Sequence, residues 1–146
     1  MIKGEEVLLE IEPGMNILEV NKQLAQKNWE LLHEHNVKAI DIMGSIGAGK
    51  TSLIEQIVQK LKTKYRITVF KGDLTTTIDA ERIGRHGVKV VTINTGRECH
   101  LDANVVSKAF EKISLQDIDL LIIENVGNLI CPAEFSLGTH KRVVVV

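Results

Sequence analysis

Apolar and polar positions follow two different rhythms along the chain, and these rhythms predict helices and strands in turn. From Asn16 to His35, apolar residues recur at steps of three and four with charged residues between them, which is the pattern of an amphipathic helix. Shorter runs are apolar without interruption, which is typical of strands buried on both faces of a sheet. The pattern predicts helices over 16–35, 51–65, 79–87 and 104–113, and strands over 37–43, 66–70, 88–95, 119–125 and 141–146.

Strands and helices alternate along the chain, and this order predicts an α/β fold with a mostly parallel sheet covered by helices on both faces. We expect one compact domain, with residues 1–36 as an N-terminal arm and helix and residues 37–146 as the α/β body. The sequence stops inside the apolar run KRVVVV. A strand there would leave an apolar sheet edge, so we expect the fold to be incomplete at its C-terminus.

Composition excludes several classes of protein. Of the 146 residues, 44% are hydrophobic and 25% are charged, as in an ordinary globular domain. The net charge of −1 and the aromatic content of 3% give no basic surface and no stacking platform, so we expect no nucleic-acid partner. No apolar run reaches the ~20 residues that span a membrane, and the acidic N-terminal stretch does not resemble a signal peptide. We therefore expect a cytoplasmic protein whose two cysteines stay reduced.

The segment GSIGAGKT, from Gly44 to Thr51, fits the phosphate-loop pattern G-x-x-x-x-G-K-[ST]. It follows a predicted strand and precedes a predicted helix, which favours a three-layer P-loop NTPase fold over a chance glycine-rich turn. Backbone N–H groups of such a loop cradle phosphate oxygens, helped by the positive end of the next helix. The residues expected to contact the nucleotide are Gly44, Ser45, Gly47, Ala48, Gly49, Lys50, Thr51 and Ser52.

Acidic residues after the predicted strands are candidates for holding Mg²⁺ together with the Thr51 hydroxyl. Asp73 and Asp79 lie in the segment GDLTTTIDAER, and Glu124 ends the most apolar strand. An alternative for Asp79 is that it merely caps the helix that begins there. Lys50 is expected to reach the β- and γ-phosphates, and Asp79 is the candidate to orient the attacking water.

Cys99 and His100 are adjacent in a loop after one strand, and Cys131 lies in the loop after another. Both loops leave the carboxyl ends of their strands, where open α/β sheets place their sites. Two thiolates and an imidazole suit Ni²⁺, Zn²⁺ or copper, with a fourth ligand from water or from a second copy. Free cysteines are also common as small buried hydrophobic residues, so spacing alone leaves both interpretations open.

Four segments together resemble successive motifs of the HypB family, the SIMIBI-class GTPases that insert nickel during hydrogenase maturation. They are GSIGAGKTSLIE, GDLTTTIDAERI, NTGRECHLDA and ENVGNLICPAEF, and the likeness extends from the N-terminal helix to Val146. The Cys-His pair and the block around Cys131 are specific to this family. Related urease accessory GTPases have a Cys-Pro-His arrangement instead.

The resemblance implies a function and a set of roles. Gly44 to Thr51 would hold GTP and Mg²⁺, Asp73 and Asp79 would belong to the first switch, and Glu124 and Gly127 to the second. The implied metal ligands for Ni²⁺ or Zn²⁺ are Cys99, His100 and Cys131. Family members dimerise when GTP is bound, and the implied partners are the hydrogenase large subunit and other maturation proteins.

Some family features are missing from this sequence. The N-K-x-D motif that recognises guanine does not occur in the 146 residues, so the preference for GTP comes only from the resemblance. The chain also has neither the N-terminal cysteine motif nor the histidine-rich tract of some members. Ser136 stands where we would expect an aspartate, and the sequence does not explain it.

Two other functions are compatible with the phosphate loop. A small P-loop kinase or ATPase would transfer phosphate with incidental cysteines, although no arginine-rich lid segment is evident. A metal-binding scaffold gated by nucleotide would show negligible turnover. Slow hydrolysis is common in switch GTPases without a partner, so a low rate does not separate this scaffold from a GTPase.

Overall fold

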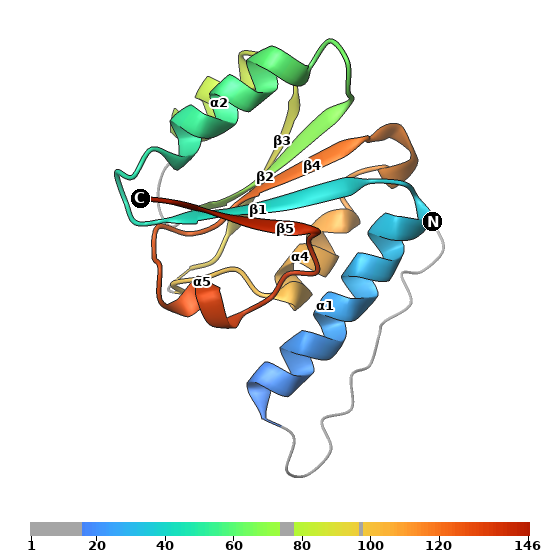
Figure 1. The fold of residues 1–146 in the computed structure, drawn as a ribbon, viewed down its shortest axis with the longest axis vertical. Helices are drawn as coiled ribbons and strands as arrows, with labels where there is room; N and C mark the ends of the chain where they lie inside the picture. The colour runs from blue at the N-terminus through green and yellow to red at the C-terminus, as the bar shows by residue number, and fades with distance from the viewer. Residues whose placement is uncertain (1–15, 74–77, 97) are drawn as a thin grey trace.

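The computed structural model describes residues 16–73, 78–96 and 98–146, apart from the side chain of Asp73. Within these ranges, one sheet lies between two layers of helices (Figure 1), which confirms the predicted α/β fold. The elements in chain order are α1 (Ile17–Glu34), β1 (Lys38–Gly44), α2 (Lys50–Leu61), β2 (Ile67–Asp73), α3 (Ile78–Gly84), β3 (Lys89–Asn94), α4 (Ala103–Phe110), the 3₁₀ helix η1 (Leu115–Asp117), β4 (Leu120–Glu124), α5 (Cys131–Glu134) and β5 (Lys141–Val145).

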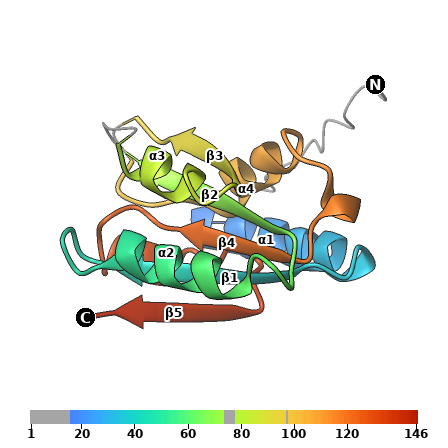
Figure 2. The same ribbon diagram turned by 90° about the horizontal axis from the view of Figure 1, so that it is seen from above.

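The sheet has the strand order β3-β2-β4-β1-β5, and every pair of neighbouring strands is parallel (Figure 2). Because the strands are parallel, their carboxyl ends meet at one edge of the sheet. The loops that follow β1, β3 and β4 all leave from this edge. In a sheet of this kind, that edge is where binding sites form.

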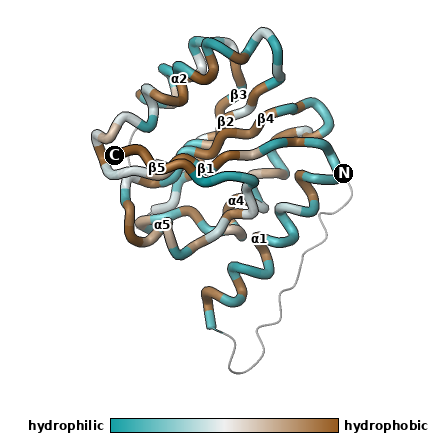
Figure 3. The backbone as a smooth tube through the Cα atoms, viewed as in Figure 1, coloured by the Kyte–Doolittle hydropathy of each residue, from teal (hydrophilic) through white to brown (hydrophobic). Residues whose placement is uncertain are grey.

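The sheet is buried on both faces, which explains the uninterrupted apolar runs. In β4, Leu121 and Ile123 pack into the hydrophobic cluster beneath α1 and α4, whereas Ile122 packs into the cluster beneath α2 and α3. In Figure 1, α2 lies above the sheet and α1 and α4 lie below it. Figure 3 shows hydrophobic colour along the strands and mixed colour along the helices. Alternate residues of one strand therefore belong to different cores, as in other parallel sheets.

Several element ends differ from the predicted ones. Helix α2 ends at Leu61 instead of residue 65, because the exposed residues 62–65 have no apolar side chain to place on the sheet except Tyr65, which is itself 48% exposed. Strand β2 continues beyond Phe70 to Asp73, because its last residues pair with β3 and β4. The short helix α5 was not predicted at all.

The N-terminal helix begins and is held as its sequence suggests. Asn16 caps α1 by accepting a hydrogen bond from the Glu19 N–H at 2.9 Å. Asn21 lies on the buried face and donates to the carbonyl of Ser136 at 2.7 Å. Ser136 is thus used here through its backbone, which any residue could supply. Leu32 packs into the core, and a domain division at residues 36 and 37 stays a prediction.

In the described ranges, no helix has the length and apolar character that a bilayer span requires.

Candidate functional site

The phosphate loop joins β1 to α2, as predicted, and its backbone requires glycine where the helix begins. Gly49 is the N-cap of α2 with φ at +103°, a left-handed conformation that side chains disfavour. Lys50 folds back over the loop, where its Nζ donates to the carbonyls of Gly44 at 3.0 Å and Ser45 at 3.3 Å. Burial lowers the pKa of Lys50, and the nearby Glu124 carboxylate opposes that effect. The loop thus presents backbone N–H groups and a confined cation.

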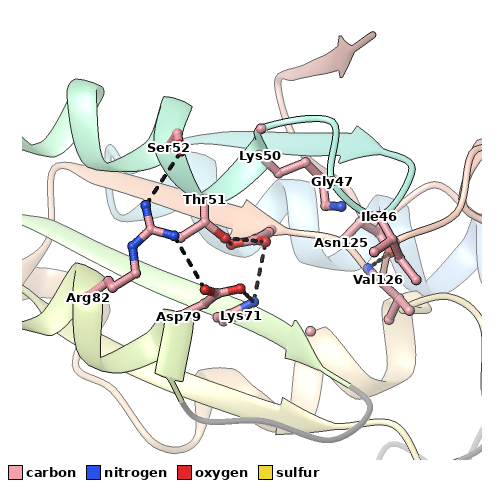
Figure 4. A pocket seen from close by; sticks show the side chains of 14 residues that line it. Ile46, Gly47, Lys50, Thr51, Ser52, Lys71, Asp79, Arg82, Asn125 and Val126 are labelled. Atoms are coloured by element: carbon pink, nitrogen blue, oxygen red, sulfur yellow. Dashed lines mark hydrogen bonds and ion pairs between the residues drawn. The ribbon is translucent and has the colours of Figure 1, made fainter.

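A cavity of about 420 Å³ opens between the phosphate loop, β2, α3 and the segment after β4 (Figure 4). Its size falls within the range of small-molecule sites. Of the residues predicted to contact nucleotide, Gly44, Ser45 and Ala48 belong to the loop but do not line the cavity. The lining residues are Ile46, Gly47, Gly49, Lys50, Thr51, Ser52, Lys71, Gly72, Asp79, Arg82, Glu124, Asn125, Val126 and Gly127.

The acidic residues of the cavity gather around Glu124. The Thr51 hydroxyl donates to both Glu124 oxygens, at 3.0 Å and 3.2 Å. Lys71 Nζ lies 3.3 Å from Glu124 Oε1 and 3.9 Å from Asp79 Oδ2, so Asp79 belongs to the same group of charges. Oxygens of Thr51 and Glu124 are the ligand type that Mg²⁺ prefers. Asp73 ends β2 at this edge, but its side chain is outside the described part of the chain.

The segment after β4 lies against the phosphate loop. Gly44 and Asn128 form an isolated antiparallel bridge, and a Cβ on Gly127 would collide with the side chain of Ile46. Glycine at position 127 is therefore a requirement of close approach. The role of Gly127 in a second switch stays a prediction.

Cys99, His100 and Cys131 come together at the same edge of the sheet. One possible ligand atom from each residue lies within 4.8 Å of the others, and all three side chains are half-buried. Cys99 Sγ is 3.6 Å from His100 Nδ1, and the His100 ring stacks on Phe135 with the ring centres 4.0 Å apart. A hydrogen bond with the Cys131 thiol raises the pKa of Cys99, and burial adds to this rise. Two thiols and an imidazole at this spacing fit Zn²⁺ or Ni²⁺, and their role as ligands stays a prediction.

Asn125 joins the two regions. It follows Glu124 directly and lines the cavity, yet its Oδ1 accepts from the N–H of Leu101 at 3.1 Å, next to His100. Its Nδ2 donates to Asp41 Oδ1 at 3.2 Å. One buried amide therefore fixes the loop of the Cys-His pair relative to the end of β4.

An ion pair between Asp41 and Arg142 connects the sheet to the segment that contains Cys131. They are directly paired residues on β1 and β5, and Arg142 Nη2 lies 2.9 Å from Asp41 Oδ2. Burial raises the pKa of Asp41, although Arg142 and the amide of Asn125 act in the opposite direction. The same guanidinium donates to the carbonyls of Pro132 and Phe135 in and after α5. Arg142 thus anchors the helix that begins at Cys131.

Sequence reasoning missed four side chains of this region: Lys71, Arg82, Asn125 and Arg142. Lys71 was missed because the strand was predicted to end at Phe70. A lysine at the end of one strand and a glutamate at the end of another would have indicated a possible ion pair. Arg82 binds Glu55 at 2.7 Å and Asp79 at 3.5 Å, and its position on α3 gave no local signal. Asn125 and Arg142 both contact Asp41, which is 84 and 101 positions away in the sequence.

A family model matches most of the chain. The model described as "CobW/HypB/UreG, nucleotide-binding domain" covers residues 38–144. The chain is 59% identical over 136 residues to the "Probable hydrogenase maturation factor HypB" of Methanocaldococcus jannaschii, which is 93% of this chain and 62% of that protein.

Solved structures show the same likeness. A crystal structure of the hydrogenase maturation factor HypB from Archaeoglobus fulgidus matches with a TM-score of 0.79 and 48% identity, over 86% of this chain and 61% of that one. A crystal structure of HypB from Helicobacter pylori in complex with nickel matches with a TM-score of 0.78 and 35% identity, over 85% and 59%. The chain thus spans about three fifths of the length of these relatives.

Proposed function

Because the chain belongs to the CobW/HypB/UreG family of nucleotide-binding domains, we propose that it is a GTPase that delivers nickel during [NiFe]-hydrogenase maturation. One observation carries the proposal: a nucleotide cavity and a Cys-His-Cys cluster lie at one edge of the sheet and share the segment after β4. Gly127 of that segment lines the cavity, and Cys131, at its other end, belongs to the cluster. The relatives named as HypB support the same function.

The cavity would bind the nucleotide through its phosphates. The N–H groups at the start of α2 and the Lys50 ammonium would neutralise the β- and γ-phosphates. Mg²⁺, when bound, would withdraw charge from the phosphate oxygens, and Thr51 and Glu124 are the residues placed to hold it. Asp79 is the candidate to orient a water for in-line attack on the γ-phosphate.

The cluster would hold Ni²⁺ or Zn²⁺ as cargo through Cys99, His100 and Cys131. Three protein ligands leave one position of a tetrahedral site for water or for a group from a second copy. We infer a homodimer when GTP is bound, with hydrolysis loosening the dimer and releasing the metal. Its partners would then be the hydrogenase large subunit and other maturation proteins in the cytoplasm.

Sedimentation velocity of this chain tests the proposal directly. The samples contain Ni²⁺ or Zn²⁺, with or without a non-hydrolysable GTP analogue. We expect a dimer that depends on the nucleotide and binds metal stoichiometrically, and we expect Cys99→Ala to lose the metal. Thr63→Ala, an exposed change in the turn after α2, is the control and should behave as wild type. Monomers without metal under every condition would contradict the proposal.

The kinase or ATPase alternative makes a different prediction. It requires ATP in preference to GTP, transfer of phosphate to a small metabolite, and no effect of metal on association. Displacement of a bound fluorescent nucleotide by unlabelled GTP or by unlabelled ATP measures the preference for guanine or adenine. Tighter binding of ATP would favour the alternative.

A further inference from the structure

Lys71 is a charged side chain in the cavity for which the phosphate-loop motif has no role. It lies on β2, in the interior of the sheet, and its side chain is 5% exposed. Lysine is rarely buried to this degree unless it is paired. Its ammonium faces two carboxylates, Glu124 at 3.3 Å and Asp79 at 3.9 Å. Figure 4 shows Lys71 and Asp79 facing Thr51 across the cavity.

The pairing of the strands fixes this arrangement. Lys71 on β2 is directly opposite Glu124 on β4, and paired residues of neighbouring parallel strands point to the same face. The two side chains therefore meet without help from a loop. Glu124 Oε1, the oxygen nearest Lys71, also accepts the Thr51 hydroxyl at 3.0 Å. The ammonium thus stands beside the oxygens that would hold a divalent cation.

A fixed cation in this place has two electrostatic consequences. It repels a divalent cation that approaches Glu124, because like charges a few ångströms apart oppose each other strongly in a partly buried site. It also adds positive charge to a cavity that would bind polyphosphate, as does Lys50. The first effect weakens the binding of Mg²⁺, and the second favours nucleotide even when Mg²⁺ is scarce.

We propose that Lys71 is a tethered cation that competes with Mg²⁺ for Glu124 and lowers the Mg²⁺ dependence of nucleotide binding. The predicted effect of Lys71 on Mg²⁺ binding rests only on the contacts of Lys71. The predicted effect on nucleotide binding, the nucleotide arm of the proposal, also rests on the proposed function. A purely structural ion pair would affect only the stability of the fold, and it would leave the balance between metal and nucleotide unchanged.

Four variants separate charge from structure. Lys71→Gln removes the charge and keeps a hydrogen-bond donor for Glu124, whereas Lys71→Met removes both and keeps an unbranched side chain that is one atom shorter. Lys71→Arg keeps the charge. Lys89→Gln removes one charge from an exposed lysine on β3, whose Nζ donates to the Lys112 carbonyl away from the cavity. Urea unfolding shows which of the two neutral variants, Lys71→Gln or Lys71→Met, remains folded. That variant is then used in both binding measurements.

The first readout is the binding of Mn²⁺ alone, measured by electron paramagnetic resonance on protein freed of nucleotide. Mn²⁺ prefers the same oxygen ligands as Mg²⁺. We expect the neutral Lys71 variant to bind Mn²⁺ at least about tenfold more tightly than wild type, because the number of uncompensated carboxylates sets the affinity. Lys71→Arg and Lys89→Gln should remain near wild type. Equal affinity in the neutral variant and Lys89→Gln overturns the proposal.

The second readout is the affinity for a fluorescent GDP in EDTA and in excess Mg²⁺. The neutral Lys71 variant should bind more weakly than wild type in EDTA, so that the ratio of the two dissociation constants rises by about tenfold or more. An unchanged ratio overturns the nucleotide arm. If no variant binds GDP at all, the proposed function fails, and the Mn²⁺ titration still decides the role of Lys71.

Discussion

The nucleotide cavity and the Cys-His-Cys cluster share one edge of the sheet, yet they are built in different ways. The charged centre of the cavity comes from strands and helix starts: Lys71 and Glu124 are paired across β2 and β4, and Thr51 lies in the first turn of α2. The cluster comes from two loops and a helix of four residues. The first is positioned by strand register, and the second by side chains that tie its loops to the sheet.

This difference suggests how the two regions communicate. A strand pair resists small displacements, so the cavity can hold charges at fixed separations. The loops of the cluster depend on Asn125 and Arg142, which contact Leu101 and the carbonyls around α5. A change in the segment after Glu124 would therefore move a predicted metal ligand without disturbing the sheet. Substitutions in the cluster, in the cavity and at the connection between them should therefore have different effects, and a substitution away from both regions should have the smallest.

Loss of a predicted metal ligand should have the largest effect. Cys131→Ala removes one of three donors, and we expect affinity for Zn²⁺ to fall by roughly 1,000-fold, more than the loss of a group that only supports a ligand. Competition with a chromophoric chelator measures it. Glu134→Gln, on the exposed side of the same helix, should bind Zn²⁺ as wild type does. Retained affinity in Cys131→Ala would mean that the metal binds elsewhere.

Loss of the phosphate-loop lysine should be the next largest. Lys50→Ala removes the cation that lies over the loop, and we expect affinity for GDP to fall by roughly 100-fold. Fluorescence titration with a labelled GDP measures it, with Lys60→Ala, an exposed change on the same helix, as the control. Affinity for Zn²⁺ without nucleotide should not change. A loss of metal binding in Lys50→Ala would mean that the two regions are not built independently.

The sequence predicted the phosphate loop better than the rest of the cavity, in which Lys71, Arg82 and Asn125 were missed, and the reason is physical. The phosphate loop is a local motif, in which Gly49 must be left-handed and Lys50 must follow it at once. Helices and strands were predicted because apolar periodicity reflects which face is buried. The ends were less accurate: β2 extends to Asp73 because neighbouring strands pair with it, and its own sequence becomes polar there.

The contacts with Asp41 that hold the supports of the cluster in place could not be predicted because they are long-range. Asn125 and Asp41 are 84 positions apart, and Arg142 and Asp41 are 101 apart. The strand order that brings them together follows from crossovers, which periodicity does not determine. A family resemblance predicted that Cys99, His100 and Cys131 form one metal site. Their spacing alone was equally compatible with incidental cysteines. Metal binding by these residues therefore stays a prediction, although the geometry suits it.

Asn125 is the side chain through which the two regions should be coupled. Asn125→Ala leaves the N–H groups of Leu101 and Val126 without their acceptor and removes one of the two side chains that donate to the Asp41 carboxylate, the other being Arg142. We therefore expect a loss of about 2 kcal/mol of unfolding free energy. Affinity for Zn²⁺ should fall by about tenfold, as is usual when a supporting group is lost. Urea unfolding and chelator competition measure the two effects.

Asn104→Ala, on the exposed side of α4, is the matched control for this change and should alter neither quantity. The decisive comparison is metal affinity with and without GDP. In wild type, the affinity for Zn²⁺ should differ between the GDP-bound and the nucleotide-free protein. In Asn125→Ala, this difference should be smaller. A full nucleotide effect in a folded Asn125→Ala protein would remove this residue from the connection.

His140 should give the smallest effect, because it directly precedes β5 and contacts Ala39 near the start of β1, at the edge of the sheet opposite both regions. The Ala39 N–H donates to His140 Nδ1 at 3.0 Å, so this nitrogen has to be unprotonated. Among the described residues, its buried Nε2 has no hydrogen-bond partner. Burial lowers the pKa of His140 below its ordinary 6.5, and the charge of Lys38 lowers it further. Protonation is therefore easier in the unfolded chain than in the folded one.

The sign of the pH dependence follows from this difference. Between the lowered pKa and 6.5, the unfolded chain binds more protons, so the unfolding free energy should fall as pH drops through 6.5. His140→Gln keeps an acceptor for Ala39 and cannot titrate, so its loss between pH 7.5 and 5.5 should be smaller by at most about 1 kcal/mol, since solvent screens a partly exposed ring. Urea unfolding at both pH values measures this, with His35→Gln as the control for losing an imidazole. An equal loss in wild type and His140→Gln would assign the acid sensitivity to other groups.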